Sequence, residues 1–325
     1  MEKLLLKNLL GMKKDVPTRA IGLELEVEAL NGSSLKFLPQ VSTAWWSTKG
    51  EGSLRHGLEY VTKAPIPIDL QKPRRIRALT DKLEAARGHI NETSFRTSTH
   101  VHVNCLDYTP TEIMTAATAY WLTENLLFKY YGKDRESNNF CLRLKDAEGL
   151  IKIVEKDVEQ KTPFVSLDTD LIRYAGLNLN SLWKFGTIEF RGMRGTIDFQ
   201  TIDEWSREAE SLVHTSIETF KSPEEILDFY FFQGTDRLID ALYSQSFRLR
   251  FKKNPNREDL VDENAYRISK FCYSTDWEKF SKIPEPKKQR SATQRRTPFN
   301  TTAQFDQIWV NDIPEEILQP VRRQA

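Results

Sequence analysis

Three short segments of this chain alternate charged and apolar residues with a period of two, and this alternation constrains the fold more than any other feature. The segments are Gly22–Glu28, His100–His102 and Glu189–Arg191. Because neighbouring side chains of a β-strand point to opposite faces, each segment is predicted to be a strand with a polar pair or triplet on one face. The sequence therefore predicts a sheet that packs one face on a core and carries charged groups on the other.

The polar face of the first segment would hold the carboxylates of Glu24, Glu26 and Glu28. Burying unpaired carboxylates is costly, because a buried charge loses its hydration and then shifts its pKa or destabilises the fold. Divalent cations and a phosphate-binding arginine would relieve that cost. The three segments therefore predict a metal and nucleotide site, with Glu28 expected to lie past the site and to be exposed.

Composition and length limit the class of protein. The 325 residues are 39% hydrophobic with a net charge of +1, which excludes a wholesale nucleic-acid binder but not a local basic patch. No apolar run approaches the ~20 residues of a membrane-spanning helix, so no membrane contact is expected. Cys105, Cys141 and Cys272 are odd in number and widely spaced, which predicts neither a disulfide framework nor a zinc site and favours a cytoplasmic protein.

The expected elements form a mixed pattern. Capping boxes predict helix starts at Thr109, Thr201 and Ser222, and leucine spacing predicts another helix between Leu70 and Arg87. Strands and helices do not alternate strictly, which favours an antiparallel sheet with helices on one side, an α+β fold. The predicted strands are Ala20–Ala29, Gly57–Thr62, Ser98–Asn104, Gly176–Leu182 and Thr187–Gly192, the last two as a hairpin that turns near residues 184–186.

The composition changes near the carboxyl-terminal end. Residues 1–283 are predicted to form one catalytic domain, and residues 284–325 are rich in lysine, arginine and proline. Such a segment has little to bury, so a flexible basic tail is expected. A tail of this charge also suits nucleic acid or an acidic partner, and its closing segment Ile308–Val321 is apolar enough to dock.

Five elements in order between Gly22 and Trp205 resemble the amidoligase family, within the glutamine synthetase and glutamate–cysteine ligase superfamily. They are Gly22-x-Glu24-x-Glu26, Glu51-Gly52-Ser53 with Gly57–Thr62, His100–Val103, Arg173 with Asn178, and Thr187–Arg191 with Gly195, Thr196 and Trp205. The resemblance implies a curved antiparallel sheet with helices on its convex side, as in the catalytic domain of glutamine synthetase. The chain departs from the family pattern at Glu51, where Asp is usual, and at Thr99, where Gly is usual.

The resemblance also implies roles for ten residues. Two Mg²⁺ or Mn²⁺ ions would share Glu24 and Glu26, with Glu51 and Glu59 completing one ion and Glu189 and a histidine, His102 in preference to His100, the other. Arg173 and Arg191 would bind the phosphates of ATP and act in catalysis with Glu189. Asn178 would join the nucleotide-binding residues or orient a substrate carboxylate, and an ordinary contact within the hairpin fits its position equally well.

The resemblance implies an ATP- and Mg²⁺-dependent ligase that forms an amide between a carboxylate and an amine through an acyl phosphate. Two alternatives remain: an inactive member that binds a partner through the same face, and a metal-dependent phosphotransferase or hydrolase. Motifs for a phosphate loop, a dinucleotide site or a zinc helix do not occur. The sequence does not indicate whether the substrates are small molecules or macromolecules, nor the oligomeric state.

Overall fold

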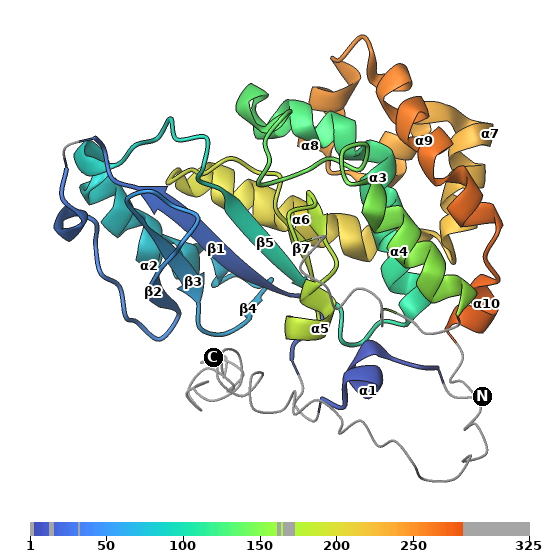
Figure 1. Cartoon of the computed structure of the whole chain (residues 1–325), viewed down its shortest axis with the longest axis horizontal. Helices are drawn as coiled ribbons and strands as arrows, with labels where there is room; N and C mark the ends of the chain where they lie inside the picture. The colour runs from blue at the N-terminus through green and yellow to red at the C-terminus, as the bar shows by residue number, and fades with distance from the viewer. Residues whose placement is uncertain (1–2, 13–15, 32, 161–163, 165–172, 282–325) are drawn as a thin grey trace, which may run out of the picture.

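The computed structural model describes residues 3–12, 16–31, 33–160, 164 and 173–281 (Figure 1). A seven-stranded antiparallel sheet has the order β2-β3-β1-β5-β7-β6, with the short β4 paired to β1. The fold is therefore mixed α and β, as predicted. The strands are β1 (Ala20–Glu28), β2 (Trp46–Gly50), β3 (Gly57–Thr62), β4 (Ile66–Pro67), β5 (Thr99–Asn104), β6 (Leu177–Asn178) and β7 (Thr187–Phe190).

Helices cover one face of the sheet and extend beyond it, so that α3, α4, α7 and α9 gather on the right of Figure 1. Within the described residues, no helix is long and apolar enough to cross a membrane. The α-helices are α1 (Leu6–Leu10), α2 (Lys72–Ala85), α3 (Pro110–Tyr131), α4 (Glu148–Glu159), α5 (Ser181–Phe185), α6 (Phe199–Thr219), α7 (Pro223–Leu242), α8 (Gln245–Lys252), α9 (Arg257–Tyr273) and α10 (Trp277–Phe280), and the 3-10 helices are η1 (Leu35–Phe37), η2 (Arg87–His89) and η3 (Lys133–Arg135).

The predicted alternation decides which face of the sheet is buried. Leu23 and Leu25 of β1 and Phe190 of β7 are at most 1% exposed, and α6 packs across β1 and β5. Trp205 of α6 meets the Phe190 ring edge-on, with 5.9 Å between the ring centroids. The apolar face is thus held against the helices, and the acidic side chains at the intervening positions of β1 lie on the opposite face.

The predicted helix starts are confirmed at two positions and wrong at a third. Thr109 and Ser222 cap α3 and α7 as expected. The capping box at Thr201 is not used, because the Asp198 carboxylate accepts a hydrogen bond of 2.7 Å from the Thr201 amide. That carboxylate is an equally good cap, so α6 begins one turn earlier than predicted.

The predicted strand Gly176–Leu182 is largely wrong. Only Leu177–Asn178 pair with β7, and the chain then forms the short helix α5 instead of a tight hairpin turn. The Ser181 hydroxyl donates to the carbonyls of Asn178 and Thr187, which turns the backbone away from an extended path. Gly186 ends α5 in the left-handed region, with φ of 68°.

Buried apolar residues from Leu6 to Phe280 form one continuous core. The three cysteines lie in buried positions and form no disulfide. The predicted boundary after residue 283, the basic segment 284–325 and its apolar part Ile308–Val321 lie outside the described residues.

Replacing Gly192 with alanine should destabilise the protein by about 1–3 kcal/mol. The new Cβ would lie 2.2 Å from Cε2 and 2.5 Å from Cδ2 of Tyr131, whose ring is fully buried against Trp205. The matched control is Gly149→Ala in α4, where a Cβ meets nothing within 4 Å and the helix should gain up to about 1 kcal/mol. Urea unfolding compares the two variants, and wild-type stability of Gly192→Ala would contradict the expected clash.

Candidate functional site

Acidic and imidazole side chains line one face of the sheet across four neighbouring strands. The register places them opposite one another, because each lies at a position that alternates with a core residue. The facing pairs are Glu26 with Glu59 between β1 and β3, Glu24 with His100 between β1 and β5, His102 with Glu189 between β5 and β7, and Asn178 with Glu189 between β6 and β7.

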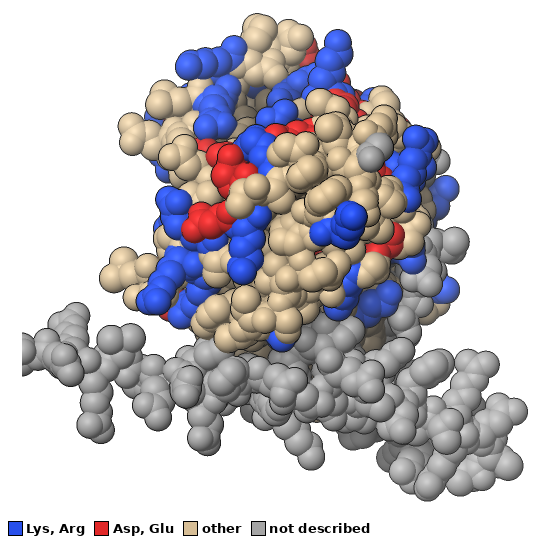
Figure 2. Space-filling model, turned by 90° about the vertical axis from the view of Figure 1, so that its left-hand side faces the viewer, with Lys and Arg blue, Asp and Glu red and all other residues tan. Residues whose placement is uncertain are grey.

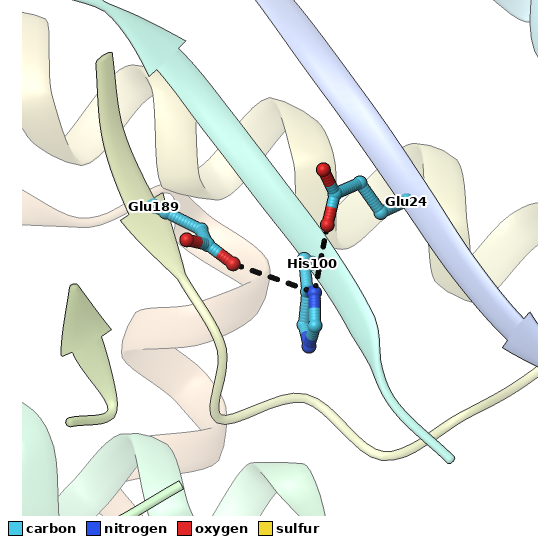
Figure 3. Close-up of side chains that lie close together, drawn as sticks. All are labelled: Glu24, His100 and Glu189. Atoms are coloured by element: carbon cyan, nitrogen blue, oxygen red, sulfur yellow. Dashed lines mark hydrogen bonds and ion pairs between the residues drawn. The ribbon is translucent and has the colours of Figure 1, made fainter. Parts of the chain in front are cut away.

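A compact donor cluster lies at the centre of this face (Figure 3). The Nδ1 atom of His100 is 3.1 Å from a Glu24 carboxylate oxygen and 3.4 Å from a Glu189 carboxylate oxygen. One ligand atom from each residue lies within 4.8 Å of the others, close enough for a single metal ion to contact all three. Since the three residues come from β1, β5 and β7, the sheet itself fixes their separation.

His102 lies beside this cluster and interacts with the same carboxylates. Its Nε2 is 3.3 Å from Glu24 Oε1, and its Nδ1 is 3.0 Å from the Thr187 hydroxyl. Burial lowers the pKa of His102, but the charges of Glu189 and Glu24 outweigh burial and raise it. Burial raises the pKa of Glu24, but His102 and His100 together lower it by more. The pKa of Glu24 is therefore well below its usual value. The cluster of three includes His100, whereas the sequence favoured His102.

A second acidic group lies next to the cluster, towards β3. The Ser98 hydroxyl donates to the Glu26 carboxylate and is 2.6 Å from Nε2 of His100. The Glu51 carboxylate accepts a bond of 3.0 Å from the Ser53 amide in the turn between β2 and β3. Burial, followed by the charges of Glu24, Glu51 and Glu26, raises the pKa of Glu59 to about 8. Like charges are therefore crowded here.

Glu28 does not belong to this site, and its expected exposure is wrong. Its side chain is buried, and its two oxygens accept bonds of 2.8 Å from the Arg55 amide and 2.6 Å from the Ser94 hydroxyl. The carboxylate thus holds the loops at the end of β1 together.

Basic and amide groups lie on the β6–β7 side. The Arg191 guanidinium is 2.5 Å from Glu189, and Asn178 Nδ2 donates to the other Glu189 oxygen at 2.6 Å. Burial lowers the pKa of Arg191, but Glu189, Glu26 and Glu24 outweigh burial and raise it. Burial raises the pKa of Glu189, and Arg191 with the two histidines reverses this shift. Arg173 stacks over the Tyr174 ring at 4.6 Å.

These groups surround a cavity of about 290 Å³, and all ten side chains singled out in the sequence line it. Its lining among the described residues includes five glutamates and four lysines or arginines. The residues from the sequence are Glu24, Glu26, Glu51, Glu59, His100, His102, Arg173, Asn178, Glu189 and Arg191; the lining residues that the sequence interpretation missed are Ser53, Arg96, Ser98, Phe140, Tyr174, Asn180, Ser181, Lys184 and Phe185.

Only some of the missed residues carry a signal in the sequence. Ser98 precedes His100 by two positions, so the same strand alternation places it on the polar face. Arg96 lies in the loop before β5 and Phe140 in an irregular segment, and no periodic pattern points to either. Figure 2 shows the sheet end of the molecule, where lysines and arginines are spread with acidic side chains between them, so this surface carries both signs of charge.

Glu59→Gln should stabilise the metal-free protein at alkaline pH. The folded pKa of Glu59 is about 8 against an ordinary 4.5, so below pH 4.5 both states hold the proton and the variant should match wild type. Between pH 4.5 and about pH 8, Glu59 is ionised in the unfolded chain but still protonated in the folded one. The stability of the wild type therefore falls with rising pH, by at most about 1.4 kcal/mol per pH unit.

Thermal unfolding in a chelator across this pH range measures the difference. The exposed Glu159→Gln is the control and should follow wild type. A Glu59→Gln variant that is no more stable than wild type above about pH 8 would contradict the crowding of charges.

Residues 57–213 match the model of a family described as "putative amidoligase enzyme". The match includes β3, β5, β6 and β7, and it begins after β1 and the turn that carries Glu51. No curated protein matches the chain.

Proposed function

Because residues 57–213 match the model of the amidoligase family, we propose that this chain is an ATP- and divalent-metal-dependent ligase that joins a carboxylate to an amine. The family match supports a ligase-type enzyme, and the cavity supports the finer assignment. The observation that carries it is the cluster of half-buried Glu24 with buried His100 and Glu189, flanked by further acids on one side and arginines on the other.

The donor set suits Mg²⁺ or Mn²⁺. Both ions favour carboxylate oxygens and accept imidazole, and neither requires the thiolates that this cavity lacks among its described lining residues. The crowding that raises the pKa of Glu59 is a cost that a bound cation would relieve. With all five glutamates ionised, the four basic residues leave the lining a formal charge of −1, which two divalent cations and a triphosphate of charge −4 would leave unchanged.

Two groups of residues would hold the metal ions. Bound there, the ions would neutralise the oxygens of the transferred phosphoryl group and hold them in place. Glu24, Glu189 and a histidine would form one group, with His100 the better placed of the two histidines. Glu26, Glu51 and Glu59 would form the other, with Glu24 able to contribute to either.

The remaining side chains would bind and orient the nucleotide. Arg191 and Arg173 present guanidinium groups to the cavity, and the planar guanidinium fork matches phosphate oxygens in pairs. Asn178 fixes the Glu189 carboxylate through a bond of 2.6 Å, which holds that group in position beside Arg191. Its first role would therefore be to orient Glu189.

The proposed reaction has two steps. A carboxylate oxygen of the acid attacks the γ-phosphorus of ATP, the bond to the β-phosphate oxygen breaks, and ADP leaves. The amine nitrogen then attacks the acyl carbon, phosphate leaves with the electron pair of the broken carbon–oxygen bond, and the nitrogen loses a proton. In this reaction most of the catalysis comes from position and charge neutralisation, which a rigid sheet face supplies.

The fold supports the same proposal. The open antiparallel sheet has α6 on its apolar face and the cavity on its polar face, the arrangement expected of a glutamine synthetase-like catalytic domain with a curved sheet and an active site on the concave side. The acid and the amine are small molecules or side chains of macromolecules.

Glu189→Gln should abolish the stabilisation that nucleotide and metal give to the wild type. At ~100 times its dissociation constant, a Mg²⁺-bound, non-hydrolysable ATP analogue stabilises a protein by ~2.7 kcal/mol, which is a shift of several degrees in the unfolding temperature. The variant loses a donor to the metal and the partner of Arg191.

Thermal unfolding with and without the ligands measures this shift in unfolding temperature. Glu155→Gln lies outside the cavity and is the control, which should show the same shift as wild type. A full shift in Glu189→Gln would contradict the site. No shift in wild type would favour an inactive, partner-binding protein.

A further inference from the structure

Arg135 in η3 is a fully buried guanidinium bound by main-chain carbonyls alone. It donates to the carbonyls of Gly192 at 3.0 Å, Arg191 at 3.1 Å, Thr97 at 3.3 Å and Phe95 at 3.4 Å. No carboxylate of the described residues lies within ion-pair distance of it. Buried charged groups are normally paired with an opposite charge, so this exception needs a reason.

The four carbonyls belong to two loops, and each loop carries an arginine that lines the cavity. Phe95 and Thr97 flank Arg96 in the loop that leads into β5, and Arg191 directly follows β7. Further bonds join the same loops: the Gly195 amide donates to the Thr97 carbonyl at 3.0 Å. Arg135 therefore holds Arg96 and Arg191 in one unit, although the two are far apart in the sequence.

Asn138 adds to this unit from the same segment as Arg135. Its Nδ2 donates to the Phe95 carbonyl at 2.7 Å, so that this carbonyl is bound from two sides. The positive charge of Arg135 also lies against both loops, and since no carboxylate of the described residues pairs with it, this charge favours an anion at this end of the cavity.

Arg96 retains donor capacity towards that anion. Its Nη1 donates to the Ser53 carbonyl at 2.7 Å, and its guanidinium lies 5.4 Å from the centre of the Phe140 ring. Its Nε is buried and has no hydrogen-bond partner among the described residues. Ser53 lies in the turn that carries Glu51, so Arg96 lies beside the second acidic group.

We propose that Arg96 is an anion-binding residue of the cavity that takes a phosphate of the nucleotide, and that Arg135 is the positioning residue that sets Arg96 and Arg191 around that phosphate. The inference rests on the proposed function and adds two residues to it. A phosphate is the fitting anion, because it would accept hydrogen bonds from the guanidinium on one side and would meet, on the other, the cation that carboxylates such as Glu51 would hold.

Calorimetric titration of the full chain with the Mg²⁺-bound ATP analogue tests the proposal, and a separate titration with Mn²⁺ alone reports on the metal donors. Arg96→Gln and Arg135→Lys should each weaken nucleotide binding at least tenfold and leave Mn²⁺ binding within about twofold of wild type. The double variant should be little weaker than the worse single variant, because both changes act on one unit. A purely structural role of Arg135 would instead weaken both titrations together.

Two further variants complete the test. Asn138→Ala removes one bond to the Phe95 carbonyl and should weaken nucleotide binding in the same direction by a smaller factor. Arg257→Lys, which perturbs a two-bonded pair with Asp236 on the helical side, is the control and should bind nucleotide as wild type does.

The outcomes separate the two claims. Wild type that binds Mn²⁺ but no nucleotide would overturn the proposed function and this inference with it. If wild type binds nucleotide and a folded Arg135→Lys variant binds it with the same affinity, the inference alone is overturned. If Arg135→Lys does not fold, unchanged binding in Asn138→Ala would overturn it.

Discussion

The crowding of carboxylates on a partly buried sheet face is the interaction on which the rest of this structure depends. Glu26 and Glu59 face each other across two paired strands, and burial with neighbouring charges raises the pKa of Glu59 to about 8. Such a face is stable only where cations or bound protons compensate for the crowded negative charges. Arg191 and His102 supply part of that positive charge. The arrangement of Glu24, His100 and Glu189 would accommodate a metal ion that supplies more of it.

The apolar face of the sheet is what keeps these acids together. A shift of one residue in the pairing of β1 with β5 would turn Leu23 and Leu25 away from the core and point Glu24 into it. The helical layer, through α6, therefore fixes the register on one side, and that register fixes the donor positions on the other. The positions of the donor groups and the packing of the core are in this sense set by the same strands.

The sequence predicted those parts of the site that obey a local period. Glu24, His100 and Glu189 were found because strand alternation marks their face, and the family resemblance added Arg173. Glu28 obeys the same alternation, but its burial depends on loops that close over the end of β1. Sequence spacing could not show that Ser94 reaches back to it.

The parts that failed or were missed depend on contacts between distant segments. A strand was predicted where Ser181 instead turns the chain into α5, since a side-chain bond to the carbonyl of Thr187 competes with the extended backbone. Arg135 and Arg96 follow no period, and their places come from carbonyls of loops that only the folded chain brings together. Sheet and site face were thus accessible from the sequence, and the loops that complete the cavity were not.

The central claim is that the sheet face binds divalent metal ions between its carboxylates. Anomalous diffraction from crystals soaked in Mn²⁺ and the ATP analogue tests it most directly. The account predicts a strong peak within coordination distance of Glu24, His100 and Glu189, and a second near Glu26, Glu51 and Glu59. A cavity without a peak at saturating Mn²⁺ would contradict it.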